Sequence, residues 1–232
     1  MNTAVDESAA DSPLSAAVAH YERGEHAAAV AGFQALAEEG DAMAQMWVGA
    51  CYAQGHGLPA SVDQALVWYR RAAENGNIQA QTNVGAMLIM GQGCEPNVPD
   101  GLSWLERAAR GGDSGAQFNL ATLYSSGDHV PEDPPQAARW YRAAAEQGHY
   151  PSQARLGYCY QCGLGVEKDR VQAFVWLSMA AQHGIGTALT QLERVAGQMS
   201  ANEKNDGLTQ LQGWREKTGL NAAAVSLQPV PA

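Results

Sequence analysis

The sequence predicts an all-α fold, an α/α superhelical solenoid of about twelve helices built from two-helix repeats. Three kinds of residue predict it by recurring every 36 positions: tryptophans, single glycines and pairs of alanines. All three keep one register, with no insertion or deletion between copies. The tryptophans are Trp68, Trp104, Trp140 and Trp176, and the alanine pairs are Ala72-Ala73, Ala108-Ala109, Ala144-Ala145 and Ala180-Ala181.

The first elements depart from this pattern. Residues 1–12 form a short acidic segment that we expect to be disordered. Residues 13–41 follow as a divergent helix pair, in which Ala29, Phe33 and Leu36 keep the spacing of the second helix of later repeats. An atypical terminal repeat is common in solenoids, because its outer face meets water instead of a neighbouring repeat.

Residues 42–185 contain four repeats of 36 residues, each with a helix A followed by a helix B. A polar residue precedes each helix B and can cap it. A glycine follows each helix B and tolerates the left-handed conformation at a helix end. The expected ranges are 43–55, 79–91, 115–127 and 151–163 for helix A, and 62–75, 98–111, 134–147 and 170–183 for helix B.

Individual columns of the repeat support these helices. The caps expected for helix B are Ser61, Asn97, Asp133 and Asp169, and the glycines after it are Gly40, Gly76, Gly112, Gly148 and Gly184. Asp41, Asn77 and Asp113 come next and are expected to cap helix A. Small residues within helix A let two helices approach closely: Gly49, Gly85, Ala121 and Gly157.

The last elements close the solenoid. Residues 186–218 are expected to be C-terminal capping helices, because Glu193 replaces the small residue of the other repeats. Ser200 and Glu203 have the spacing of a capping box. Residues 219–232 are expected to be a disordered tail.

Two segments resemble the Sel1-like repeat family: AQTNVGAMLIMGQGC (80–94) and ARLGYCYQCGLGVEKDRVQAFVWLSMAAQHG (154–184). The period of 36, against 34 for the related tetratricopeptide repeats, favours Sel1. The resemblance implies a tetratricopeptide-like superhelix whose helices A line the concave side, and a role as an adaptor or scaffold. Many bacterial members of that family are exported, so the resemblance also raises export as a possibility for this chain. His129 departs from the pattern, since other repeats have glycine there, so we expect its loop to differ.

The solvent-facing columns of helix A are expected to form a partner-binding groove. Segments 43–54, 79–90, 115–126 and 151–162 contain no acidic residue, and Arg155 is their only charge. Amide side chains match both groups of a peptide bond, arginines can hold a carboxylate, and aromatic rings can seat apolar side chains. The candidate partner-binding residues are Trp47, Asn83, Asn119, Arg155, Gln191, Met46, Thr82, Phe118, Tyr158 and Arg194.

A structural interpretation of the same residues stays open. The asparagines can bond a neighbouring helix instead of a partner, and Met46 can pack in the core. Cys159 and Cys162 form a C-x-x-C pattern inside a predicted helix, with no second pair and no histidine nearby, which favours packing over a metal or redox site.

Charge and composition exclude several kinds of partner. The formal net charge of -10 argues against nucleic acid and anionic membranes. No apolar run approaches the ~18 residues of a membrane span. No signal peptide is visible in MNTAVDESAADSP, so the chain is expected to be cytoplasmic, with an exported or processed form left open. No nucleotide-binding or H-E-x-x-H motif occurs, so no cofactor or metal is expected.

The function favoured by these observations is a non-enzymatic scaffold or adaptor that binds a partner protein or peptide in the helix A groove. Two alternatives stay open. The resemblance implies one of them, a bacterial immunity-type or regulatory protein that neutralises a specific partner. The other is a hydrolytic or metal-dependent enzyme.

Overall fold

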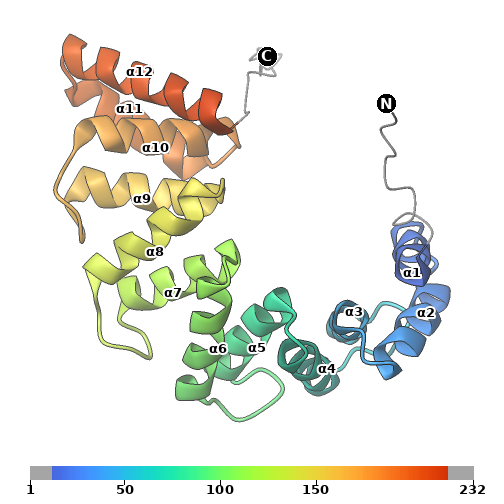
Figure 1. Ribbon diagram of the computed structural model, residues 1–232. Coiled ribbons are helices and arrows are strands. Elements are labelled where there is room, and N and C mark those ends of the chain that lie inside the picture. Colours follow the sequence, from blue (N-terminus) through green and yellow to red (C-terminus); the bar gives the residue numbers. More distant parts are fainter. Residues whose placement is uncertain (1–11, 219–232) are drawn as a thin grey trace, which may run out of the picture. The chain divides into compact units, whose positions relative to one another are not determined.

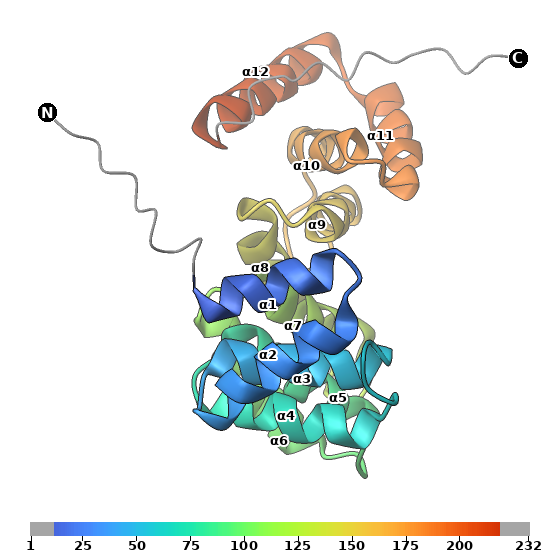
Figure 2. The ribbon, with the colours of Figure 1, turned by 90° about the vertical axis from the view of Figure 1, so that its right-hand side faces the viewer.

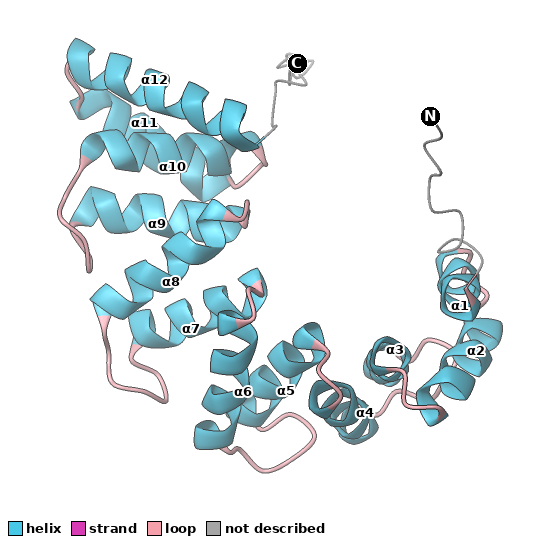
Figure 3. Ribbon diagram, viewed as in Figure 1, coloured by secondary structure: helices cyan, strands magenta, loops and turns pink. Residues whose placement is uncertain are grey.

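The computed structural model describes residues 12–218, and all regular structure in that part of the chain is α-helical (Figure 3). Twelve helices occur there, as the sequence predicts. The expected disordered segments lie outside the described residues, except Ser12. Its hydroxyl oxygen accepts a hydrogen bond from the Ser15 backbone N–H at 3.1 Å and caps the first helix. Within residues 12–218, no helix has both the length and the apolar character needed to span a membrane.

The chain divides into two compact units, residues 1–116 and 117–232. In the first unit, helices α1 to α6 pack in chain order, each against the next (Figures 1 and 2). Helix α7 begins in this unit and ends in the second. The helices are α1 (Pro13–Glu22), α2 (His26–Glu38), α3 (Ala42–Gln54), α4 (Val62–Glu74), α5 (Ile78–Met90), α6 (Val98–Arg110) and α7 (Ser114–Ser126).

In the second unit, α8 packs on α9 and α9 packs on α10. Helix α10 is then covered by both closing helices, α11 and α12 (Figure 1). The bounds are α8 (Pro134–Glu146), α9 (Tyr150–Cys162), α10 (Arg170–Gln182), α11 (Gly186–Gln198) and α12 (Ala201–Thr218). The four A helices begin and end one residue earlier than expected.

The helices begin at the capping residues that the repeat columns predict. Asp41, Asn77 and Asp113 each accept a hydrogen bond from the backbone N–H three residues on, at 2.7, 2.8 and 2.6 Å. Ser61, Asn97, Asp133 and Asp169 do the same for the B helices, at 3.2, 3.2, 3.0 and 3.0 Å. Ser200 and Glu203 exchange the two hydrogen bonds of a capping box. Each cap satisfies a backbone donor that the helix leaves free.

The chain reverses after each helix B through a residue with positive φ. These are the predicted glycines, with φ of 94, 90, 95, 86 and 79° at Gly40, Gly76, Gly112, Gly148 and Gly184. His129 is the one non-glycine residue with positive φ in the described chain, at 67°, close to the 74° of Gly57. Its loop therefore keeps the left-handed backbone of the other repeats at this position. The loop differs one residue earlier, as expected: the Asp128 N–H donates to the Ser126 hydroxyl at 3.2 Å, whereas the equivalent N–H groups of the other repeats donate to a carbonyl of helix A.

Buried glutamines in the A helices tie consecutive helix pairs together. The side-chain Nε2 of Gln45 donates to the Ala37 carbonyl at 3.1 Å, and those of Gln81 and Gln153 donate to Ala73 and Ala145 at 3.2 Å. In two repeats the glutamine oxygen is also bonded. Asn75 donates to Gln45 Oε1 at 2.9 Å, and Gln147 donates to Gln117 Oε1 at 2.8 Å. A buried amide is costly unless it is bonded, so these contacts fix how one pair follows the next.

The small residues of helix A permit close contact with helix B, as predicted. A Cβ added at Gly49 would lie 2.7 Å from the Tyr69 ring, and one added at Gly157 would lie 2.7 Å from Leu177. Aliphatic and aromatic side chains from both helices fill the core of each unit around these contacts. The exposed positions of helix A are thereby turned away from helix B.

Candidate partner-binding site

A hollow of about 550 Å³ lies in the second unit, on the A helices α9 and α11. Four of the candidate residues line it: Phe118, Arg155, Tyr158 and Gln191. Arg155 and Tyr158 are one helical turn apart on α9 and share a face of that helix. Gln191 occupies on α11 the repeat position that Arg155 occupies on α9, because the two are 36 residues apart. The repeat therefore brings these side chains to one place.

Residues near the start of α9 and α11 complete the wall of the hollow. Pro151 and Thr187 stand at equivalent repeat positions, and Ile185 precedes α11. The sequence analysis missed these three residues. The signal that could have found them is the repeat column that Pro151 and Thr187 share, one helical turn before the column of Arg155.

Arg155 supplies the charge of the hollow. Its side chain is exposed, and among residues 12–218 it has neither an ion-pair partner nor a hydrogen bond. By contrast, Arg110 pairs with Glu106, and Arg142 donates to the Tyr160 hydroxyl at 2.7 Å. No acidic side chain lines the hollow. An anion reaching this site would meet a cation that no acidic side chain neutralises.

Tyr158 and Phe118 give the hollow its aromatic surface. Tyr158 is 39% exposed. A tyrosine is ordinarily neutral near pH 7, and the hydrogen bond with the Cys162 thiol raises the pKa of this phenol further. Phe118 is half-buried, and its ring lies 5.1 Å from that of His149 and 5.9 Å from that of Tyr141. The site thus joins one cation to an uncharged aromatic surface.

The first unit has a comparable hollow of about 590 Å³, to which Asn83 contributes. Asn83 and Ala86 line it at the repeat positions of Arg155 and Tyr158. Tyr69 and Met87 also line it, and no charged residue does. Equivalent columns of the repeat therefore form a hollow in each unit, charged in the second and neutral in the first.

The other candidate residues do not line either of these two hollows. Trp47 is half-buried and stacks on Phe33 with ring centroids 5.3 Å apart. Thr82 donates a hydrogen bond to Asp113 at 2.9 Å. Asn119 is half-buried, Arg194 is exposed, and neither lines a hollow described above.

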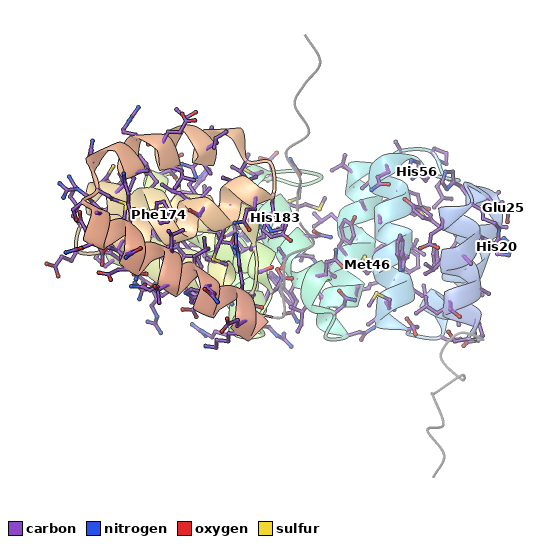
Figure 4. All side chains as sticks on the ribbon, turned by 90° about the horizontal axis from the view of Figure 1, so that it is seen from above. His20, Glu25, Met46, His56, Phe174 and His183 are labelled. Atoms are coloured by element: carbon purple, nitrogen blue, oxygen red, sulfur yellow. The ribbon has the colours of Figure 1, made fainter. Side chains whose placement is uncertain are left out.

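The structure contradicts the prediction that Met46 contacts a partner. This residue is 7% exposed and packs in the core with Leu66, Tyr69 and Met87 (Met46 is labelled in Figure 4). Its side chain is not available to a partner, and the structural interpretation of this residue holds.

The reactive side chains of α9 do not form a second kind of site among the described residues. Cys159 is buried, which raises the pKa of its thiol to about 11, whereas Cys162 is exposed. His149 contacts the Ser152 hydroxyl at 2.8 Å, but Ser152 is fully buried and out of reach of a substrate. Within residues 12–218 no three His, Cys, Asp or Glu side chains are grouped to hold a metal ion.

Comparison with known proteins identifies the family. The Sel1 repeat model matches residues 42–77, 78–113, 114–149 and 151–185. A protective antigen of uropathogenic Escherichia coli with an SLR fold is 30% identical, with a TM-score of 0.75, over 88% of this chain and 46% of its own. A Sel1 repeat protein from Oxalobacter formigenes is 36% identical, with a TM-score of 0.69, over 73% of this chain and 49% of its own.

A more distant structure covers nearly the whole chain. An immunity protein from Pseudomonas aeruginosa matches 93% of this chain and 88% of its own at 18% identity, with a TM-score of 0.52. No curated protein matches the sequence. The chain spans about half the length of the Escherichia coli and Oxalobacter structures. With four matched repeats covering most of its length, the chain is an all-α solenoid that belongs to the Sel1 repeat family.

Proposed function

We propose that this protein binds a partner protein through the exposed faces of its A helices, and that the hollow between α9 and α11 seats a segment of the partner. Sel1 repeat proteins generally mediate protein–protein interactions. The observation that carries the proposal is the hollow lined by Phe118, Arg155, Tyr158 and Gln191. It pairs an unengaged cation with exposed aromatic surface, and aromatic and arginine side chains dominate the binding energy of interfaces.

The test compares two variants of the full chain for capture of its partner. Arg155→Glu with Tyr158→Ala changes the hollow, while Arg139→Glu makes the same charge change on the exposed surface of α8. We expect the hollow variant to lose at least about 2 kcal/mol of binding free energy and the α8 variant to keep wild-type affinity. Circular dichroism and thermal melting establish that both variants are folded. Equal affinity of all three proteins would refute this site.

A narrower function, neutralisation of a toxic partner, is favoured by one observation. The chain shares its fold over most of its length with a protein named as an immunity protein. Expression of each neighbouring gene with and without this chain tests this function, because the chain should restore growth wherever the product of a neighbouring gene is toxic. Loss of protection in the Arg155→Glu variant would place that activity at the same hollow.

A further inference from the structure

The hollow between α9 and α11 has a chemistry that selects among peptide segments, and the following inference rests on the proposed function. Arg155 is exposed, lacks an ion-pair partner among the described residues, and stands beside Tyr158 on α9. Phe118, Pro151 and Ile185 give the rest of the wall an apolar character. A ligand that fills this space removes water from one side of Arg155, and an anionic group compensates that loss best because charge-assisted hydrogen bonds are the strongest.

The charge of the second unit decides how acidic the ligand can be. Residues 117–218 carry ten acidic and nine basic side chains, whereas residues 12–116 carry eleven acidic and five basic ones. The second unit is therefore almost neutral in total and does not repel a single carboxylate. Among the described residues, Arg155 is the one charged residue that lines the hollow, so it can neutralise one carboxylate and not a run of them. The balance favours one acidic side chain among apolar neighbours.

We infer that the occupant of this hollow is an extended peptide segment in which one Asp or Glu is flanked by apolar side chains. The carboxylate pairs with the Arg155 guanidinium, and the apolar neighbours pack against Phe118, Tyr158 and Ile185. Guanidinium and carboxylate have matching planar geometry, so the pair gives direction as well as affinity.

The experiment uses three libraries of N-acetylated, C-amidated nine-residue peptides with Asp, Asn or Lys fixed at the centre and the other positions varied. The wild-type full chain should retain Asp-centred peptides with apolar residues beside the Asp. Individual peptides from this set should bind at least about tenfold more weakly when the Asp is replaced by Asn, as expected for loss of a charge-assisted pair.

Variants of Arg155 separate the pairing from general attraction. Arg155→Gln should bind the Asp and Asn forms equally, and Arg155→Glu should prefer the Lys form. Arg139→Gln, at an exposed arginine of α8 that does not line the hollow, should keep the wild-type preference. No enrichment of Asp-centred peptides, or a preference unchanged in Arg155→Gln, would overturn the inference.

Tyr158→Ala distinguishes failure of the inference from failure of the proposed function. If Tyr158→Ala weakens the retained peptides but the Arg155 variants do not alter their charge preference, the hollow binds peptides and only the acidic requirement is wrong. If neither residue affects peptide binding, the hollow is not the site and the proposed function fails with it. Competition by a C-amidated synthetic peptide of residues 219–232, which has no acidic group, would assign the hollow to the chain's own segment and overturn the inference.

Discussion

Single side chains decide how well each repeat satisfies its buried polar groups. In the last full repeat, His183 stands where Asn75 and Gln147 stand in other repeats. Its ring stacks on Tyr150 with centroids 3.4 Å apart instead of bonding the buried glutamine (His183 is labelled in Figure 4). Gln153 Oε1 is left buried and without a hydrogen-bond partner among the described residues. This repeat therefore lacks the hydrogen bond that Asn75 and Gln147 donate to the buried glutamines of two other repeats.

Restoring the amide should stabilise the second unit. We expect His183→Asn to raise the free energy of unfolding by about 1 kcal/mol, because the gain from satisfying a buried acceptor exceeds the lost ring stacking. Asn75→Ala is the matched opposite change and should lower stability by about 1–2 kcal/mol, since it leaves Gln45 Oε1 unpaired. Urea unfolding of both variants measures the two effects. A destabilised His183→Asn protein would mean that the stacked ring contributes more than the missing hydrogen bond.

At the scale of elements, the loop after each helix A meets the start of the preceding helix B. Within the first unit, a Cβ added at Gly93 would lie 2.7 Å from the Val62 carbonyl oxygen, and one added at Gly57 would lie 2.6 Å from that of His26. Gly76, after helix B, also has positive φ but has no atom within 4 Å of such a Cβ. The two glycine classes thus have different reasons for being glycine.

Alanine substitution separates these reasons. Gly76→Ala should cost about 1 kcal/mol, from backbone strain alone. Gly93→Ala should cost about 3 kcal/mol, because the added methyl group also pushes the loop off α4. Chemical denaturation of both variants under the same conditions gives the comparison. Equal losses would show that the contact between loop and helix adjusts at little cost.

The element level is also where sequence analysis succeeds. The caps at Asp41 and Ser61 and the left-handed Gly40 follow from local geometry, which a 36-residue repeat displays several times over. The candidate binding site can be predicted only in part from these repeat columns. Met46 and Phe118 occupy the same repeat position, yet Met46 is buried and Phe118 lines the hollow. The difference depends on side chains from other helices, and a column of one helix carries no information about them.

At the scale of the whole molecule, buried thiol and phenol groups make the folded protein less stable at alkaline pH. Burial raises the pKa of the Cys51 and Cys159 thiols to about 11, and burial raises that of the Tyr69 phenol to about 12. The unfolded thiols ionise near pH 8.5. Between about pH 8.5 and 11 the unfolded chain therefore binds fewer protons than the native one, and the free energy of unfolding falls as the pH rises.

Removing the two buried thiols should flatten this dependence. We expect Cys51→Ala with Cys159→Ala to lose a smaller share of its own pH 7 stability by pH 10.5 than the wild type loses. Cys162→Ala, at an exposed thiol, serves as the control and should follow the wild-type curve. Denaturant titrations at several pH values measure the slopes. An unchanged slope in the double variant would show that other groups govern the alkaline limit.

The glutamine bonds between consecutive helix pairs have a consequence for how such chains lengthen. Gln45, Gln81 and Gln153 each reach a carbonyl eight residues back, across the turn that links two repeats. Adding or deleting one residue in that turn would misplace the amide and leave two buried groups unpaired. Adding or removing a whole 36-residue repeat leaves these glutamine hydrogen bonds intact. The number of repeats can therefore vary, whereas the length of each repeat cannot.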